Sequence, residues 1–273
     1  NNGNILNKSN EKLINYLKVL GYKHRGFSKD FIYEQPRFTF RLDIDKDFDN
    51  VYKNFHPTTR KILNKGNLYN LNIYKGTIDD IDKFYETMKD TASRESLHLT
   101  PIEYYKNFYN ILNKQNMCDL YIVEVKISEL IKTYENNIIN FEEELKSLDD
   151  PKYKNKEKQK NIKNDLINKI TKNKKEIDFI KSIDKQVIVL SSIISVKYGN
   201  KVWTIHGGNS NILRELNSNY LLYLEIIKGA NKEGFKFFDF FGTSGNANSD
   251  RNDPIFGIHM FKKRFGGEYT EFI

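Results

Sequence analysis

A basic triplet near the end of the chain is the strongest candidate for chemistry. The three cations Lys262, Lys263 and Arg264 lie between Phe261 and Phe265. Flanking aromatic residues favour burial, so this triplet is held more firmly than a basic run in a tail would be. A cation held in place can stabilise a phosphate or a developing oxyanion. The alternative interpretation is a surface charge run beside a turn.

Two other segments carry candidate residues. Arg60 lies in the basic run from Thr58 to Lys61, at a predicted helix start. Asp239 opens the sequence Asp239-Phe240-Phe241-Gly242. This sequence differs from the Asp-Phe-Gly motif of protein kinases by one extra residue, and neither an HRD motif nor a glycine-rich loop precedes it. We therefore expect Asp239 to orient a group or to have a structural role.

Metal and cofactor motifs are missing from the sequence. It has no phosphate-binding P-loop, nucleophile elbow, HExxH or EF-hand pattern, and its five histidines are scattered. Cys118, the single cysteine, can form no internal disulfide and is predicted to be a small buried hydrophobe. The glycine-containing loop with which N-acetyltransferases bind a pyrophosphate is also missing, which disfavours acetyl-CoA. We predict no cofactor and no metal.

Composition narrows the class of protein. The 273 residues carry a net charge of +8 and a pI near 9.1, which suits a polyanionic partner, although many proteins are this basic without one. Aromatic residues make up 14% of the chain, too many for a wholly disordered protein. No apolar run approaches the roughly 20 residues that span a bilayer, and no secretion signal is recognisable. We expect a cytoplasmic protein.

The elements that must position these residues alternate between helices and mostly antiparallel strands. This order predicts an α+β layered fold. Gly234 should end the helix before it as a C′ glycine, and Thr77 is a predicted N-cap. Predicted strands cover 38–43, 119–125, 186–196, 201–206 and 235–241. Gly207 should end the strand 201–206. Predicted helices cover 11–20, 79–89, 91–112 and 219–233.

Residues 127–185 have a different pattern. Apolar residues recur with alternating spacings of 4 and 3 in two runs, which is typical of a coiled-coil seam, and Asp149-Asp150-Pro151 separates the runs. The first arm, 129–150, has two Lys and seven acidic residues, and the second, 151–185, has 12 Lys and five acidic residues. These opposite charges favour an antiparallel helical hairpin. The seam positions are Ile127, Ile131, Tyr134, Ile138, Phe141, Leu145 and Leu148, then Leu166, Ile170, Asn173, Ile177 and Ile180.

An ordered set of short motifs resembles one family. Residues 220–230, 234–242, 256–257 and 261–268 are similar to the closing signature of the Fem-type (FemABX) peptidoglycan aminoacyltransferases. Residues 20–27, 35–37 and 42–43 resemble the family's central region, and Thr59-Arg60-Lys61 resembles one of its helix starts. The charged hairpin lies where FemA-like members carry a coiled-coil arm.

The resemblance implies a fold and a domain division. It implies GNAT-like domains of the acyl-CoA N-acyltransferase type, the first one partial, with an inserted antiparallel coiled-coil hairpin. Residues 1–45 would be the remnant of the first domain, 46–126 and 186–273 the second domain, and 127–185 the arm. Family members are longer, so we expect this chain to be truncated at its N-terminus.

The resemblance also implies an activity. Family members transfer an amino acid, with glycine our best expectation here, from aminoacyl-tRNA to an amine of a peptidoglycan pentapeptide precursor, whether lipid-linked or UDP-linked. Lys262 matches the lysine that is thought to stabilise charge in their transition state. We expect Arg94, Tyr220, Asp239, Lys263 and Arg60 to contact substrate.

Further expectations concern partners. We expect the arm to contact tRNA, transient contact with the inner membrane surface, and self-association or pairing with another Fem-type protein. Some relatives support antibiotic resistance by changing the cell-wall bridge. The alternative is a catalytically inactive scaffold that binds tRNA or protein. The expected tRNA contacts are Lys163, Lys169, Lys172, Lys174 and Lys175.

Overall fold

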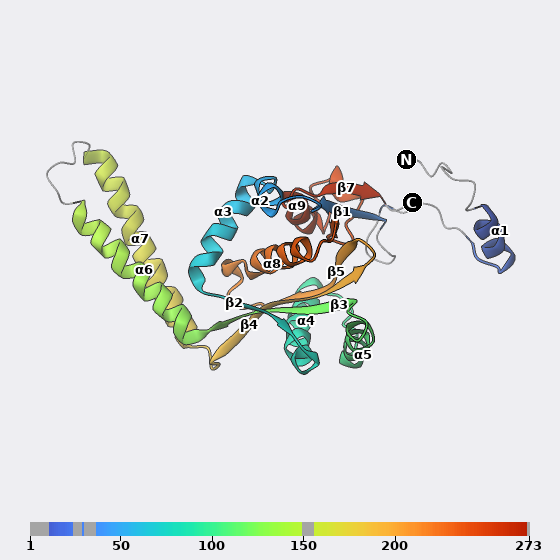
Figure 1. Cartoon of the computed structure of the whole chain (residues 1–273). Helices are drawn as coiled ribbons and strands as arrows, with labels where there is room; N and C mark the ends of the chain where they lie inside the picture. Colours follow the sequence, from blue (N-terminus) through green and yellow to red (C-terminus); the bar gives the residue numbers. More distant parts are fainter. Residues whose placement is uncertain (1–10, 24–28, 30–36, 149–155, 272–273) are drawn as a thin grey trace. The chain divides into compact units, whose positions relative to one another are not determined.

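The computed structural model describes residues 11–23, 29, 37–148 and 156–271 (Figure 1). The chain forms two compact units. The first unit combines Asn1–Asp43 with Asp239–Ile273, and the second is Ile44–Phe238. The domain division expected from the sequence stays a prediction. Residues 24–27 and 35–36 of the family resemblance, and the helix break at 149–151, lie outside the described residues.

The first unit contains a pair of antiparallel strands and a short helix around an aromatic core. Phe40 meets the ring of His259 edge-on, with centroids 4.8 Å apart, and Phe240 packs against Phe265 at 5.5 Å. All ten residues from Glu11 to Leu20 are exposed. The elements are α1 (Glu11–Val19), β1 (Phe38–Asp43), η5 (Asn246–Asn248), α9 (Phe256–Arg264) and β7 (Glu268–Glu271).

The second unit contains an antiparallel sheet in the order β2-β3-β4-β5. Its helices α4 and α5 cover one face and α8 the other (Figure 1). The core between α4, α5 and the sheet includes Phe84, Tyr105, Leu120 and Ile194. The strands are β2 (Asn72–Gly76), β3 (Cys118–Lys126), β4 (Val187–Tyr198) and β5 (Lys201–Asn209), and β6 (Phe237–Asp239) spans the point where the second unit ends.

Several predicted element ends are confirmed. Gly234 follows α8 with φ +84°, as a C′ glycine does, and Thr77 accepts a hydrogen bond from the backbone N of Asp79 in a capping box. The helices of this unit are α2 (Phe48–Lys53), α3 (Pro57–Gly66), η2 (Asn67–Tyr69), η3 (Ile78–Asp80), α4 (Ile81–Glu95), α5 (Ile102–Asn113), α6 (Ile127–Ser147), α7 (Lys156–Lys181), η4 (Arg214–Leu216) and α8 (Ser218–Lys232).

Three predictions about elements are wrong. The predicted helix 91–112 is broken, because α4 ends before Ser96 at φ +53° and α5 begins after Pro101. The strand β5 does not end at Gly207 but runs on to Asn209. The strand predicted over 235–241 is only β6, because Phe241 adopts a left-handed conformation at φ +54°.

Gly208 explains the continuation of β5. A Cβ atom at this position would lie 2.4 Å from the backbone carbonyl carbon of Thr87 on α4. The glycine therefore allows the strand and the helix to approach more closely than any side chain would permit.

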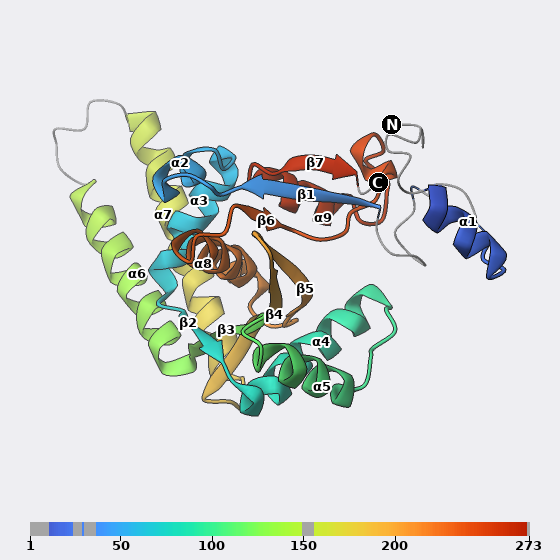
Figure 2. The same cartoon turned by 45° about the vertical axis from the view of Figure 1, so that its right-hand side comes forward.

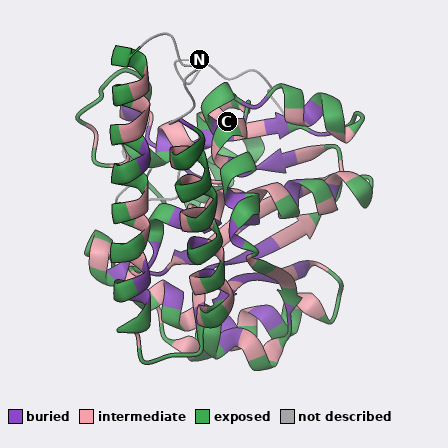
Figure 3. Ribbon diagram, turned by 90° about the vertical axis from the view of Figure 1, so that its left-hand side faces the viewer, coloured by how far each residue is buried: buried purple, intermediate pink, exposed green. Residues whose placement is uncertain are grey.

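Helices α6 and α7 lie side by side and run in opposite directions (Figures 1 and 2). Every predicted seam position is buried or half-buried, including Tyr134 and Leu148 on α6 and Leu166, Ile177 and Ile180 on α7. Exposed residues dominate the outer faces of both helices (Figure 3). None of the helices in the described ranges combines the length and apolarity that crossing a bilayer requires.

Candidate active site

Lys262 is buried near the C-terminal end of α9. Its side chain is only 8% exposed. The amine donates hydrogen bonds to the backbone oxygens of Phe241 and Gly242, each at 2.5 Å. An ammonium group has three N–H donors, so these two carbonyls leave one donor for another oxygen.

The two carbonyls belong to a tight turn that follows β6. One carboxylate oxygen of Asp239, Oδ1, accepts a hydrogen bond from the backbone N of Phe241 at 2.9 Å. The same oxygen accepts from the Thr39 hydroxyl at 2.5 Å. An aspartate that bonds to the backbone two residues ahead forms an Asx-turn, and such turns tolerate left-handed conformations nearby. The turn therefore presents two successive carbonyls to the amine.

Strand β1 fixes this turn from the other side. The backbone N of Phe240 donates to the oxygen of Phe40 at 2.9 Å, and that of Thr243 donates to the oxygen of Phe38 at 2.8 Å. Thr39 lies between these two strand residues and holds Asp239. Three consecutive residues of β1 thus hold residues 239–243.

The electrostatics of Lys262 follow from its burial. Burial lowers the pKa of the amine to about 7, and the carboxylate of Asp239 opposes this shift. Arg41 on β1 places Nε 3.7 Å from Oδ2 of Asp239. Neither of these two atoms has a hydrogen-bond partner among the described residues. Near neutral pH, both the charged and the neutral forms of Lys262 are therefore populated.

The start of α9 is anchored to the same segment. Ser244 donates to Oδ2 of Asp253 at 2.8 Å, and Oδ1 of Asp253 accepts from the backbone N of Ile255 at 2.9 Å. Nδ1 of His259 lies 3.1 Å from the Thr243 hydroxyl. Burial and the nearby Lys263 lower the pKa of His259. These contacts fix the position of the helix that carries Lys262.

The basic triplet does not act as one unit in space. Successive residues of a helix point about 100° apart. Lys262 points inward, Lys263 is exposed, and Arg264 is half-buried. The expectation of a cation held between aromatic residues thus fits Lys262, whereas Lys263 lies on the surface.

Arg94 lies on α4 in the second unit, where its guanidinium is already engaged. Its Nη1 donates to the Asn211 side chain at 2.6 Å and to the backbone oxygen of Asn209 at 3.3 Å, and its Nε donates to the carboxylate of Glu95 at 3.0 Å. The hydroxyl of Thr91 accepts from the backbone N of Asn209 at 2.8 Å. Arg94 therefore fixes the segment after β5 to α4.

Arg60 and Tyr220 also lie in the second unit. Arg60 is half-buried in the first turn of α3, which His56 caps through Nδ1 and the backbone N of Thr58 at 3.2 Å. The helix start predicted at Thr58 is thus confirmed within one residue. Tyr220 is half-buried in the first turn of α8.

The predicted tRNA contacts on α7 differ in their surroundings. Lys169 pairs with Asp165 at 2.6 Å, and Lys174 lies 4.0 Å from Glu142. Lys172 and Lys175 are exposed, and no described carboxylate lies within 4.0 Å of either amine. Lys163 is half-buried.

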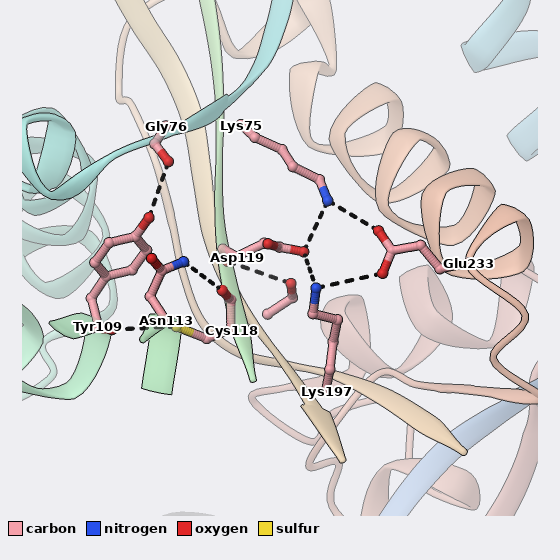
Figure 4. A network of polar contacts seen from close by, with 9 residues as sticks. Lys75, Gly76, Tyr109, Asn113, Cys118, Asp119, Lys197 and Glu233 are labelled. Atoms are coloured by element: carbon pink, nitrogen blue, oxygen red, sulfur yellow. Dashed lines mark hydrogen bonds and ion pairs between the residues drawn. The ribbon is translucent and has the colours of Figure 1, made fainter. Parts of the chain in front are cut away.

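A second charge cluster lies between β2, β3, β4 and α8 (Figure 4). Lys75 contacts Asp119 at 3.0 Å and Glu233 at 3.1 Å, while Lys197 contacts the same two carboxylates at 2.9 and 3.4 Å. Burial opposes the charge of Lys75, but the hydrogen bonds to Asp119 and Glu233 raise its pKa above the ordinary value. The four charges neutralise one another, so the cluster links elements of the second unit rather than offering a free charge.

Metal ions in proteins are held by sets of His, Cys, Asp and Glu ligands. Within the described ranges, no three His, Cys, Asp or Glu side chains are close enough together to hold an ion. Cys118 is fully buried, as predicted, and burial raises the pKa of its thiol to about 11.

Sequence reasoning missed the residues that support Lys262. Thr39 and Arg41 lie in a strand whose pattern signalled only a core. The available signal for the turn was Asp239 two residues before Phe241, because aspartate at that spacing forms Asx-turns. Nothing in the sequence indicated that its carbonyls would face a lysine 20 residues later.

Comparison with known proteins matches the FemAB family over residues 1–273. The chain is 28% identical over 264 residues to the lipid II:glycine glycyltransferase of Staphylococcus haemolyticus (strain JCSC1435), covering 93% of this chain and 62% of that protein. The protein of the same name from Staphylococcus aureus (strain USA300) is 27% identical over 269 residues, with the same coverage.

A solved structure agrees with the family match. The crystal structure of FemX aligns with a TM-score of 0.67 at 26% identity, covering 96% of this chain and 67% of that one. The chain spans 62% of the length of the two staphylococcal relatives. Because the family match extends over all 273 residues, the chain belongs to the FemAB family.

Proposed function

We propose that this chain transfers an amino acid, glycine, from an aminoacyl-tRNA to an amine of a peptidoglycan precursor. The observation that carries the proposal is the buried amine of Lys262, held by two backbone carbonyls in a member of the FemAB family. Glycine and a lipid-linked acceptor are suggested by the names of the staphylococcal relatives.

The proposed reaction is aminolysis of an ester. The acceptor amine, after losing a proton, attacks the carbonyl carbon that joins the amino acid to tRNA. A C–N bond forms, and the carbonyl oxygen carries a negative charge in the tetrahedral intermediate. Collapse breaks the ester C–O bond, the nitrogen loses a second proton, and the ribose oxygen leaves with a proton. The ester is already activated, so a covalent enzyme intermediate is unnecessary.

Lys262 would stabilise the oxyanion as an ammonium ion. Both of its carbonyl partners carry partial negative charge, which favours the protonated amine, and Asp239 has the same effect. The remaining N–H donor would then bind the developing oxyanion in a site of low dielectric, where such a bond is strong. An uncharged Lys262 would instead accept a proton from the attacking amine.

We propose that the lysine-rich face of α7 contacts tRNA. Lys172 and Lys175 are three residues apart on one face of the helix and are exposed. Replacing both by Ser should lower the slope of log affinity against log salt by about 1.5, since each phosphate contact contributes about 0.7 to 0.9. The matched control changes Lys12 and Lys18 on α1, which removes the same charge. Equal slopes for both variants would overturn this contact.

The other substrate contacts remain proposals. Arg60, Lys263 and Tyr220 would contact the tRNA or the precursor, and Arg94 would do so through N–H groups beyond those it already uses. A lipid-linked precursor would bring the protein to the inner face of the membrane, alone, as a homo-oligomer or paired with another Fem-type protein. We also propose that the fold is GNAT-like and that α6 and α7 form a coiled coil.

A transfer assay tests the proposed function. A mixed pool of tRNAs carrying labelled amino acids is incubated with a lipid-linked pentapeptide precursor and this chain, with the Staphylococcus aureus relative as positive control. We expect labelled precursor, with glycine as the label transferred. If the relative yields product and this chain yields none with any amino acid, the proposal fails, and a tRNA- or protein-binding scaffold becomes the better account.

A further inference from the structure

We propose that Asp239 is a positioning residue for the transfer reaction, acting through the 239–242 turn that holds the amine of Lys262. The inference rests on the proposed function. The carboxylate has no place in the bond changes of ester aminolysis, yet it is fully buried beside the amine that we propose to be catalytic.

Asp239 is connected to the amine of Lys262 through the backbone of Phe241. Oδ1 of Asp239 accepts from the backbone N of Phe241 at 2.9 Å, and the carbonyl of Phe241 accepts from Nζ of Lys262 at 2.5 Å. The backbone of Phe241 thus links the carboxylate to the amine, with its N–H bound to Asp239 and its carbonyl bound to Lys262. Moving the carboxylate changes the backbone conformation of Phe241 and so displaces the carbonyl that holds the amine.

The backbone at Phe241 is strained. Phe241 has φ +54°, a conformation that costs a bulky non-glycine residue free energy. Such a conformation persists only when its surroundings determine it. The hydrogen bonds of Asp239 to Thr39 and Phe241 fix this conformation. As a result, the carbonyls of Phe241 and Gly242 both point at Lys262.

Asp239 also contributes to the electrostatics of Lys262. The charged and titratable groups around Lys262 are Asp239 at the end of β6, Arg41 on β1, which faces Asp239, and Lys263 and His259 on α9 itself. The carboxylate of Asp239 acts on Lys262 itself, whereas that of Asp253 acts on His259, so Asp239 favours the ammonium form that the oxyanion requires.

Two variants separate the geometric contribution from the charge. Asp239→Asn keeps an oxygen that accepts from the backbone N of Phe241 but removes the charge. Thr39→Val keeps the charge but removes the hydroxyl that holds it, and Thr39→Ser restores that hydroxyl.

The first readout needs no substrate. Lysine labelled with ¹³C at Cε reports its own protonation by NMR, and the Lys262 signal is assigned by its loss in Lys262→Arg. We expect the titration midpoint of Lys262 to fall in Asp239→Asn, because the charge that favours the ammonium is gone. An unchanged midpoint in a folded variant would overturn the charge contribution of Asp239.

The second readout is the transfer reaction itself. In Thr39→Val we expect kcat to fall by about 10-fold or more, because misplacing a catalytic group by 1 Å can cost about 100-fold. In Asp239→Asn we expect a fall of about 10-fold for each unit by which the pKa of Lys262 falls below the assay pH, because less of the lysine is then an ammonium ion. KM for both substrates should be unchanged in both variants. Thr39→Ser should restore kcat. In Asp239→Asn the pH above which kcat declines should also move down, since activity requires the ammonium.

The two readouts also separate the possible failures. A wild-type chain without transfer activity contradicts the proposed function, while the NMR titration still decides whether Asp239 controls Lys262. A wild type that is active, with variants that lose thermal stability but keep the kcat, pH profile and Lys262 midpoint of the wild type, would make Asp239 a purely structural residue. If Asp239→Asn does not fold, Thr39→Val and Thr39→Ser decide the matter.

Discussion

Replacing Lys262 by Met tests the electrostatic cost of burying this amine. A lysine ordinarily titrates at 10.5, and burial lowers the pKa of Lys262 to about 7. The two values differ by about 3.5, and each pKa unit corresponds to about 1.4 kcal/mol. Folding therefore disfavours the charged lysine by about 5 kcal/mol.

The sign of the pH dependence follows from proton binding. Between pH 7 and 10.5 the unfolded chain holds a proton on this lysine that the folded chain has lost, so stability rises with pH in that window. Met does not titrate. The free energy of unfolding of the wild type minus that of Lys262→Met should therefore rise by about 3 kcal/mol between pH 6 and pH 9.

Urea unfolding followed by circular dichroism at pH 6, 7, 8 and 9 measures this difference. Subtracting the free energy of unfolding of the variant from that of the wild type cancels the contributions of groups that titrate in both proteins. The control is Lys106→Met, because Lys106 is 42% exposed and pairs with Asp82 on the surface. The free energy of unfolding of the wild type minus that of Lys106→Met should vary little with pH. A wild-type minus Lys262→Met difference that is flat from pH 6 to 9 would refute the argument that burial controls this amine.

Three further predictions concern the second unit and a control glycine. Gly208→Ala should destabilise the protein by about 1 to 3 kcal/mol because its Cβ would overlap the Thr87 backbone, whereas Gly257→Ala, with nothing within 4 Å, should be neutral or stabilising in thermal melts. Burial lowers the pKa of His206 to about 4. The contribution of this histidine to stability is therefore present above pH 6.5 and lost as pH falls towards 4. Over that range the free energy of unfolding of His206→Phe should fall by about 3 kcal/mol less than that of the wild type. Asp119→Asn should cost about 1 to 3 kcal/mol in chemical unfolding, because it weakens contacts to two lysines, and an unchanged midpoint would show that this network adds no stability.

Local pattern was sufficient for several elements whose intrinsic propensity and apolar pattern agree. The strand 38–43 was predicted with its observed ends, and the helix 219–233 was displaced by one residue. The buried and half-buried positions along α6 and α7 were predicted from the spacing of the apolar residues. In these segments, burial and local propensity favour the same structure.

The wrong predictions about element ends concern segments where a side-chain hydrogen bond or the close packing of two elements outweighs intrinsic secondary-structure propensity. The run 235–241 is rich in Phe and has strong strand propensity, but the Asp239 side chain binds the backbone N of Phe241 and ends the strand early. The predicted helix 91–112 ignored Pro101, which is an available signal for a helix start. The continuation of β5 through Gly208 depends on the position of α4, which no local pattern reports.

The candidate site was predicted only in part. Lys262 was selected because it lies among aromatic residues and matches a family motif, and its burial fits that choice. Its carbonyl partners and the role of Thr39 depend on contacts between segments about 200 residues apart, such as Thr39 with Asp239. A single sequence contains no measure of such contacts.

The most direct test of the account is single-turnover transfer of labelled glycine from glycyl-tRNA to the lipid-linked precursor. Wild type, Lys262→Met and Lys106→Met are compared at pH 6.5. The account predicts product with the wild type and Lys106→Met, and a rate lower by about 100-fold or more in Lys262→Met, the size expected when one oxyanion donor is lost. A Lys262→Met variant that is folded and transfers glycine at the wild-type rate would contradict it.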